Sequence, residues 1–132
     1  MQKLLFQMAP DVADKGPSEA TIQSHIMARL RQRRYMVVRF NGGGFKKNGQ
    51  FVFNYIIQGL NSSKGFPDVV AFKDGRCYLI EVKTKTGRLS LFQRNFRDYA
   101  VHFGTSVHVV RSVDELDELL DKEEARHAAA HS

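Results

Sequence analysis

The segment GFPDVVAFKDGRCYLIEVKTKTG, residues 65–87, decides the fold of this chain. It predicts two short β-strands, DVVAF and RCYLIEVK, because β-branched and aromatic residues flank the turn signal KDG. Side chains alternate across a strand, so Glu81 and Lys83 lie on one face, about 7 Å apart along the strand. A strand that only fills a core does not need these charges, nor the aspartate Asp68 that opens the first strand.

The sequence around this hairpin predicts further helices and strands. Apolar residues at helical spacing predict a helix over residues 17–34. Ser90 and Ser112 each precede a glutamine or a glutamate by three residues, the spacing of a capping box, so a helix is predicted to begin after each serine. Strand-forming residues fill three more segments: 35–40, 49–56 and 106–112. This order is typical of an α/β domain with a mixed central sheet flanked by helices.

The helix after Ser90 carries an apolar face that we expect to be buried. Its members are Phe92, Phe96, Tyr99, Ala100 and Phe103.

A basic loop, GGGFKKNG at residues 42–49, separates two of the predicted strands. Two interpretations stay open. In one, Lys46 and Lys47 follow a sugar-phosphate backbone while Phe45 stacks on a base. In the other, the loop is a plain hairpin connection.

The net charge of +6 is distributed unevenly along the chain. Residues 113–124 hold seven of the fourteen acidic side chains and one lysine, for a net charge of −6. Residues 1–112 hold 18 basic and 7 acidic side chains, for a net charge of +11. A basic body with one acidic helix favours a polyanionic partner such as nucleic acid. Ordinary solubility charge is the competing explanation.

The chain of 132 residues has the length of one domain. We divide it into an N-terminal arm, residues 1–16, a single domain, residues 17–124, and a disordered tail, residues 125–132. The one cysteine, Cys77, rules out a disulfide framework and a thiolate zinc site, and we expect it to be a small buried residue. The N-terminal LLFQM run is too short for a signal peptide or a membrane span. We therefore expect a soluble, cytoplasmic protein with no membrane partner.

Two carboxylates and a lysine gather where the strands of the central hairpin end. Asp68 and Glu81 lie on adjacent paired strands, and Lys83 follows Glu81 on the same face. Carboxylate oxygens are ligands for a hard divalent cation, and the backbone carbonyl of Val82 and water complete the shell. A lysine instead orients or deprotonates an attacking water, or stabilises charge on a phosphate. Phosphodiester hydrolysis needs these parts.

The competing interpretation is a salt bridge between Lys83 and one of the acids, worth less than ~1 kcal/mol at a surface. Two acids compete for that one lysine, however, and basic residues flank the strand ends: Lys64, Lys85 and Arg88. We expect these three to contact phosphates. Glu19 lies near the middle of the apolar stripe of the first helix, which aims it at the sheet. An acid that only complements the helix dipole would face solvent instead.

A wider string of residues resembles the VRR-NUC family, the virus-type replication-repair nucleases of the PD-(D/E)xK superfamily. Its parts are KGFPD at 64–68, EVK at 81–83, GRLS at 87–90 and Gln93. The resemblance covers roughly residues 18–110, and the small size resembles stand-alone phage and bacterial members. It implies a restriction-endonuclease-like core and cleavage of DNA that depends on Mg²⁺ or Mn²⁺.

The resemblance also implies a role for each matching position. Asp68 and Glu81 are metal ligands, Lys83 is the catalytic lysine, and Glu19 corresponds to the first-helix glutamate, which reaches the metal through water. Gln93 corresponds to the glutamine that supports the site, although its capping-box position explains it equally well. Stand-alone members resemble dimeric Holliday junction resolvases, so a homodimer that cuts four-way DNA junctions is implied, in the host cytoplasm if the chain is viral.

Other functions remain in competition with a junction resolvase. Within enzymes, the alternative is a nuclease for flaps or for other DNA. From another class, the alternative is a non-catalytic DNA-binding module with the same fold, whose affinity falls steeply with salt. An RNA substrate stays open, because nothing in the predicted site discriminates a 2′-hydroxyl.

Overall fold

A computed structural model describes residues 16–40, 44–53 and 55–131 of the chain. Along the chain the elements are α2 (Glu19–Gln32), β1 (Met36–Arg39), β2 (Gly44–Lys47), β3 (Gln50–Phe53), β4 (Val69–Lys73), β5 (Arg76–Val82), α3 (Leu91–Val101), β6 (Val107–Val110) and α4 (Val113–Ala130). Residues 1–15, most of the predicted N-terminal arm, lie outside the described part.

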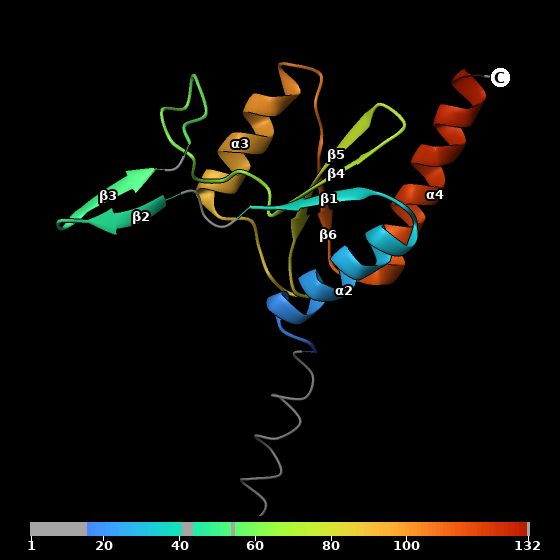
Figure 1. The fold of residues 1–132 in the computed structure, drawn as a ribbon, viewed down its shortest axis with the longest axis horizontal. Helices are drawn as coiled ribbons and strands as arrows, with labels where there is room; N and C mark the ends of the chain where they lie inside the picture. The colour runs from blue at the N-terminus through green and yellow to red at the C-terminus, as the bar shows by residue number, and fades with distance from the viewer. Residues whose placement is uncertain (1–15, 41–43, 54, 132) are drawn as a thin grey trace, which may run out of the picture.

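A four-stranded sheet of order β1-β4-β5-β6 forms the centre of the fold (Figure 1). The β1–β4 and β4–β5 pairs are antiparallel, whereas β6 runs parallel to β5. The tight β4–β5 turn is made by Asp74 and Gly75, both with positive φ, as a two-residue hairpin turn requires. The predicted α/β class with a mixed central sheet flanked by helices is confirmed.

The helices cover both faces of this sheet. On one face, α2 and α4 pack around the fully buried Ile26, Leu30 and Leu116. On the other face, α3 packs through Phe96 and Ala100. Alternation along β5 distributes its side chains between these two cores, because successive residues of a strand point to opposite faces. The face that carries Glu81 is therefore the face that α3 covers.

The basic segment expected as a loop is partly a strand. β2 pairs with β3 in a separate two-stranded sheet that projects from the central one (Figure 1). Asn48 and Gly49 form its turn with φ of 52° and 78°. The predicted loop is wrong over residues 44–47, and the predicted strand 49–56 contributes only β3, outside the central sheet. The stacking predicted for Phe45 concerns a side chain outside the described part.

Three further sequence predictions are wrong. Phe92 and Phe103 are 47% and 68% exposed, because α3 reaches the sheet only through the narrower stripe that includes Phe96. Cys77 is exposed, since it lies next to the hairpin turn rather than under α3. The tail expected to be disordered from residue 125 is helical through Ala130, because strong helix formers continue α4.

None of the helices in the described segments combines the length and apolar content that a membrane crossing requires.

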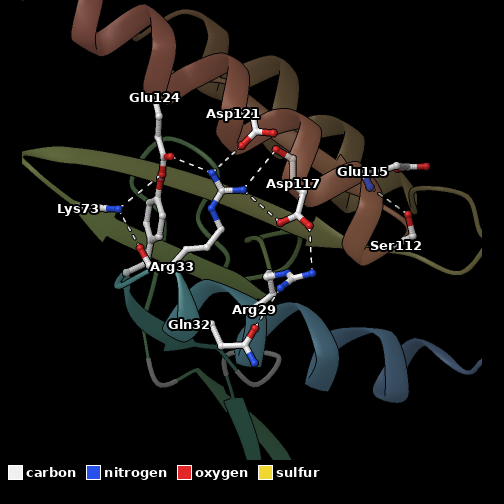
Figure 2. A network of polar contacts seen from close by, with 10 residues as sticks. Arg29, Gln32, Arg33, Lys73, Ser112, Glu115, Asp117, Asp121 and Glu124 are labelled. Carbon is white, nitrogen blue, oxygen red and sulfur yellow. Dashed lines mark hydrogen bonds and ion pairs between the residues drawn. The ribbon is translucent and has the colours of Figure 1, made fainter.

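A network of ion pairs joins α4 to α2 and the start of β1 (Figure 2). The Arg33 guanidinium contacts Asp117 at 3.2 Å, and Asp121 and Glu124 at 2.8 Å each. Glu124 also accepts a hydrogen bond from the Tyr35 hydroxyl. The acidic helix therefore neutralises basic residues elsewhere in the fold through three of the seven acidic side chains that the sequence concentrates there.

We expect Glu124→Gln to lower the free energy of unfolding by about 1–2 kcal/mol at neutral pH. Partial burial alone would raise the pKa of Glu124, but hydrogen bonds from Tyr35 and Arg33 outweigh it and hold the pKa below 4.5. A carboxyl with a lowered pKa stabilises the fold above its unfolded pKa, and that contribution disappears as the pH falls through its folded pKa.

Urea unfolding of wild type and Glu124→Gln at neutral pH and at successively lower pH measures this contribution. The difference between the two proteins should shrink as the pH drops below about 4.5. The control is Glu118→Gln, on the exposed side of the same helix. A Glu124→Gln protein no less stable than this control would contradict the prediction.

Candidate active site

Asp68 lies at the edge of the sheet where β5 ends, and hydrogen bonds to the chain on both sides hold it in place. It immediately precedes β4 and stands opposite Glu81, since Val69 pairs with Ile80 in the register. Its backbone carbonyl accepts a hydrogen bond of 2.8 Å from the N–H of Phe40. Its side-chain Oδ2 accepts one of 3.1 Å from the N–H of Val82. The carboxyl group is thereby oriented across the end of β5.

Glu81 is buried, with only 1% of the residue exposed. Its Oε1 accepts a hydrogen bond of 3.1 Å from Nε2 of Gln93. Its Oε2 is buried and has no hydrogen-bond partner among the described residues. Burial, together with the negative charge of the adjacent Asp68 carboxyl, raises the pKa of Glu81 to about 9. A buried carboxylate oxygen without a partner is costly, so this site is built to hold a positive group or a proton.

Gln93 makes the contacts that both interpretations of the sequence require. Its backbone N–H donates to Oγ of Ser90, and its Oε1 accepts from the Ser90 N–H at 2.8 Å, which completes a capping box at the start of α3. Its Nε2 is then free to point at Glu81. One side chain caps the helix and orients the carboxylate.

Lys83 is also buried, with 9% of the residue exposed. Its backbone N–H donates to the Val110 carbonyl at 3.1 Å, which anchors the end of the strand to β6. Its positive charge lowers the pKa of Glu81, so the two side chains lie within electrostatic reach of each other. The ion pairs found between described residues do not include Lys83. Within the described part of the chain, the competing interpretation, a salt bridge of Lys83 with Glu81 or Asp68, is therefore not supported.

The comparison with known families agrees with this geometry. A model of the VRR-NUC domain matches residues 18–114 of the chain. The chain belongs to the VRR-NUC family. It is accordingly a nuclease, a hydrolase that acts on DNA. No curated protein and no solved structure matches the chain significantly.

Glu19 occupies the edge of the VRR-NUC site rather than its centre. It is exposed, and the expectation that it points at the core is wrong. Ser18 is the N-cap of α2, so Glu19 is the first helical residue, where the helix end extends beyond the buried stripe. Its charge nevertheless reaches Glu81 and is the weakest of the contributions that raise the Glu81 pKa.

The predicted DNA-contacting residues of the VRR-NUC domain are exposed but lie in two places. Lys64, Lys85 and Arg88 belong to the loops on either side of the site, and the Lys64 ammonium lies 4.9 Å from the centre of the Phe92 ring. Lys46 and Lys47 are exposed on the β2–β3 hairpin instead. Their phosphate contacts stay predictions.

Sequence reasoning missed a hollow beside the site. This cavity of about 220 Å³ is bordered by Asp68 and Gln93, and its walls include four aromatic side chains, Phe40, Tyr55, Phe66 and Phe92. No spacing in the sequence links these four, because they come from separate segments.

The donor set of the VRR-NUC site fits a hard divalent cation held by few protein ligands. The described residues contain no group of three or more His, Cys, Asp and Glu side chains positioned around one metal ion. Two carboxyls, Asp68 and Glu81, converge instead, and the unpartnered Glu81 Oε2 supplies a free oxygen. Mg²⁺ commonly binds through one or two carboxylates and keeps water and substrate phosphate as its other ligands. A role for the Val82 carbonyl stays a prediction.

Proposed function

We propose that this VRR-NUC protein is a metal-dependent endonuclease that hydrolyses phosphodiester bonds in branched DNA and acts as a Holliday junction resolvase. The observation that carries the metal-dependent site is the buried, unpartnered Oε2 of Glu81 beside the Asp68 carboxyl. The preference for four-way junctions is supported by the resemblance to stand-alone members of the family.

Asp68 and Glu81 would hold Mg²⁺ or Mn²⁺, with the Val82 carbonyl as a further ligand and Glu19 acting through water. Such a metal would supply polarisation of the scissile phosphoryl group and neutralisation of its developing charge. Gln93 keeps Glu81 in the orientation that binding requires, as its 3.1 Å hydrogen bond supports. Lys83 orients the attacking water and stabilises negative charge on the phosphate.

A homodimer follows from the substrate. A four-way junction has near two-fold symmetry, and paired cuts need two sites related by a two-fold axis. The described part of one chain carries one such site. We therefore propose that two copies act on one junction, each cutting one strand.

Cleavage of a labelled four-way junction, beside flap, duplex and single strand, tests the proposal. The reactions contain Mg²⁺, Mn²⁺ or EDTA. We expect paired symmetric nicks on the junction with either metal and none with EDTA. Cutting of flaps or duplex alone would retain the site and reject the resolvase. Tight binding without cutting in either metal would leave a DNA-binding module.

A further inference from the structure

Four arginines border one groove on the face of the sheet that carries the active site. The groove has a volume of about 350 Å³ and lies between α3, β6 and the segment that leads from β5 to α3. Its arginines come from three segments: Arg88, Arg94, Arg97 and Arg111. None of the described residues that line it is acidic, and Leu89 and Val109 complete the lining. Like charges repel, so four arginines around one groove make it a favourable place for an anion, whose binding would relieve that repulsion.

The arginines of this groove differ from those on the opposite face of the sheet. Arg29 and Arg33 both belong to the ion-pair network with α4 (Figure 2), at distances of 3.3 Å or less. Within the groove, Arg97 has only a 3.7 Å contact with Asp98, an aspartate that is 72% exposed. An exposed pair of this length is worth little. The positive charge of the groove is therefore not neutralised as the charge of Arg29 and Arg33 is.

Arg111 shapes the groove and connects it to the catalytic strand. Its Nη1 donates to the carbonyls of Thr84 and Gly87 at 2.6 and 2.7 Å. These residues belong to the loop that follows Lys83. The guanidinium therefore fixes the loop that follows the catalytic strand while it lines the groove.

The groove begins one helical turn from the residue that orients Glu81. Gln93 and Arg97 are four residues apart on α3, so they project from neighbouring turns of one side, about 6 Å apart along the axis. Arg94 is exposed and Arg97 is partly exposed on this side. A DNA strand with its phosphate at Glu81 would pass the guanidinium groups of both arginines if it continued along α3.

We infer that this arginine groove binds the phosphodiester backbone of the DNA arm that continues beyond the scissile phosphate. Guanidinium groups bind phosphate oxygens in pairs, which makes arginine well suited to this contact. The inference rests on the proposed function for the branched DNA ligand. It adds Arg94 and Arg97 to the DNA-contacting residues and gives the bound arm a direction along α3.

The test compares DNA binding by Arg94→Ala/Arg97→Ala and by wild type in EDTA, where no cutting takes place. The probe is a fluorescein-labelled four-way junction, titrated at several salt concentrations. We expect the double variant to bind about tenfold more weakly. We also expect the slope of log K against log salt to become smaller by about 2, since two phosphate contacts are lost.

The matched control is Arg31→Ala/Arg126→Ala, which also removes two positive charges, from exposed positions on α2 and α4 on the other face of the sheet. It should keep the wild-type slope. A double variant with the affinity and slope of this control would overturn the inference. If the double variant does not fold, phenylglyoxal modification of wild type decides, because bound DNA should protect Arg94 and Arg97. Equal modification of Arg94 and Arg97 with and without DNA would refute the inference that the groove binds DNA.

Failure of the groove and failure of the proposed function give different results. If wild type cuts no DNA in any metal, the nuclease mechanism fails, yet the binding comparison in EDTA still tests the groove. If wild type cuts junctions while the double variant binds as well as wild type, the groove fails and the active site stands.

Discussion

Lys83→Ala should lower the rate of DNA cleavage by about 10²–10³ while leaving DNA binding nearly intact. The lysine is buried at the end of β5 within electrostatic reach of Glu81, and it forms none of the ion pairs found in the described part of the chain. In the proposed mechanism its ammonium group acts on the attacking water and on the phosphate, so its loss removes an interaction that strengthens in the transition state.

The measurement is the single-turnover rate of cleavage with saturating metal, together with DNA affinity in EDTA. The control is Lys122→Ala, which removes an exposed lysine from α4. A Lys83→Ala enzyme that cuts within about threefold of wild type would show that the lysine has no catalytic role. Equal losses of affinity and rate would indicate that Lys83 only binds DNA.

Gly65→Ala should destabilise the protein strongly and also disable the site. Gly65 has φ of +90°, and a Cβ at this position would lie 2.1 Å from the backbone carbonyl oxygen of Phe92. The obstacle is backbone at the start of α3, so it cannot rotate away as a flexible side chain can. The loop that carries Asp68 must then separate from the helix that carries Gln93.

Gly75→Ala separates the two causes of the expected destabilisation, backbone strain at positive φ and the clash with the Phe92 carbonyl. Gly75 also has positive φ, +76°, but nothing lies within 4 Å of a Cβ built there. Backbone strain alone should cost it about 1 kcal/mol. We expect urea unfolding to show that Gly65→Ala lowers the free energy of unfolding by at least about 2 kcal/mol more than Gly75→Ala does, because of overpacking. Displacing Asp68 should reduce cleavage about 10²-fold. Equal stability of the two variants would show that the contact with Phe92 relaxes easily.

The central hairpin and its site could be predicted because the information is local. The turn signal and the strand period define β4 and β5, and the same period places Glu81 and Lys83 on one face. The capping spacing of Ser90 and Gln93 defines the start of α3 in the same way. Each of these predictions depends on residues a few positions apart, where backbone geometry alone sets the spacing.

Features that depend on which surfaces meet could not be predicted. The exposure of Phe92 depends on which residues of α3 contact the sheet. The exposure of Glu19 depends on how far the first turn of α2 extends beyond the edge of the sheet. The arginine groove assembles from segments that no spacing connects, although the i, i+3 pair of Arg94 and Arg97 on a predicted helix was a signal. The helical tail shows the opposite case, since its composition favoured a helix and the expectation of disorder overlooked it.

The two ends of the Gln93 amide have consequences for how this protein can change. Its oxygen caps the start of α3, and its nitrogen orients the buried Glu81 carboxyl group. A substitution that retains only the bond to Ser90 should preserve stability and lower the cleavage rate. One that retains only the bond to Glu81 should do the opposite. Selection for faster cleavage and selection for higher stability therefore both act on the side-chain amide of Gln93. Neither property can change at this position without affecting the other.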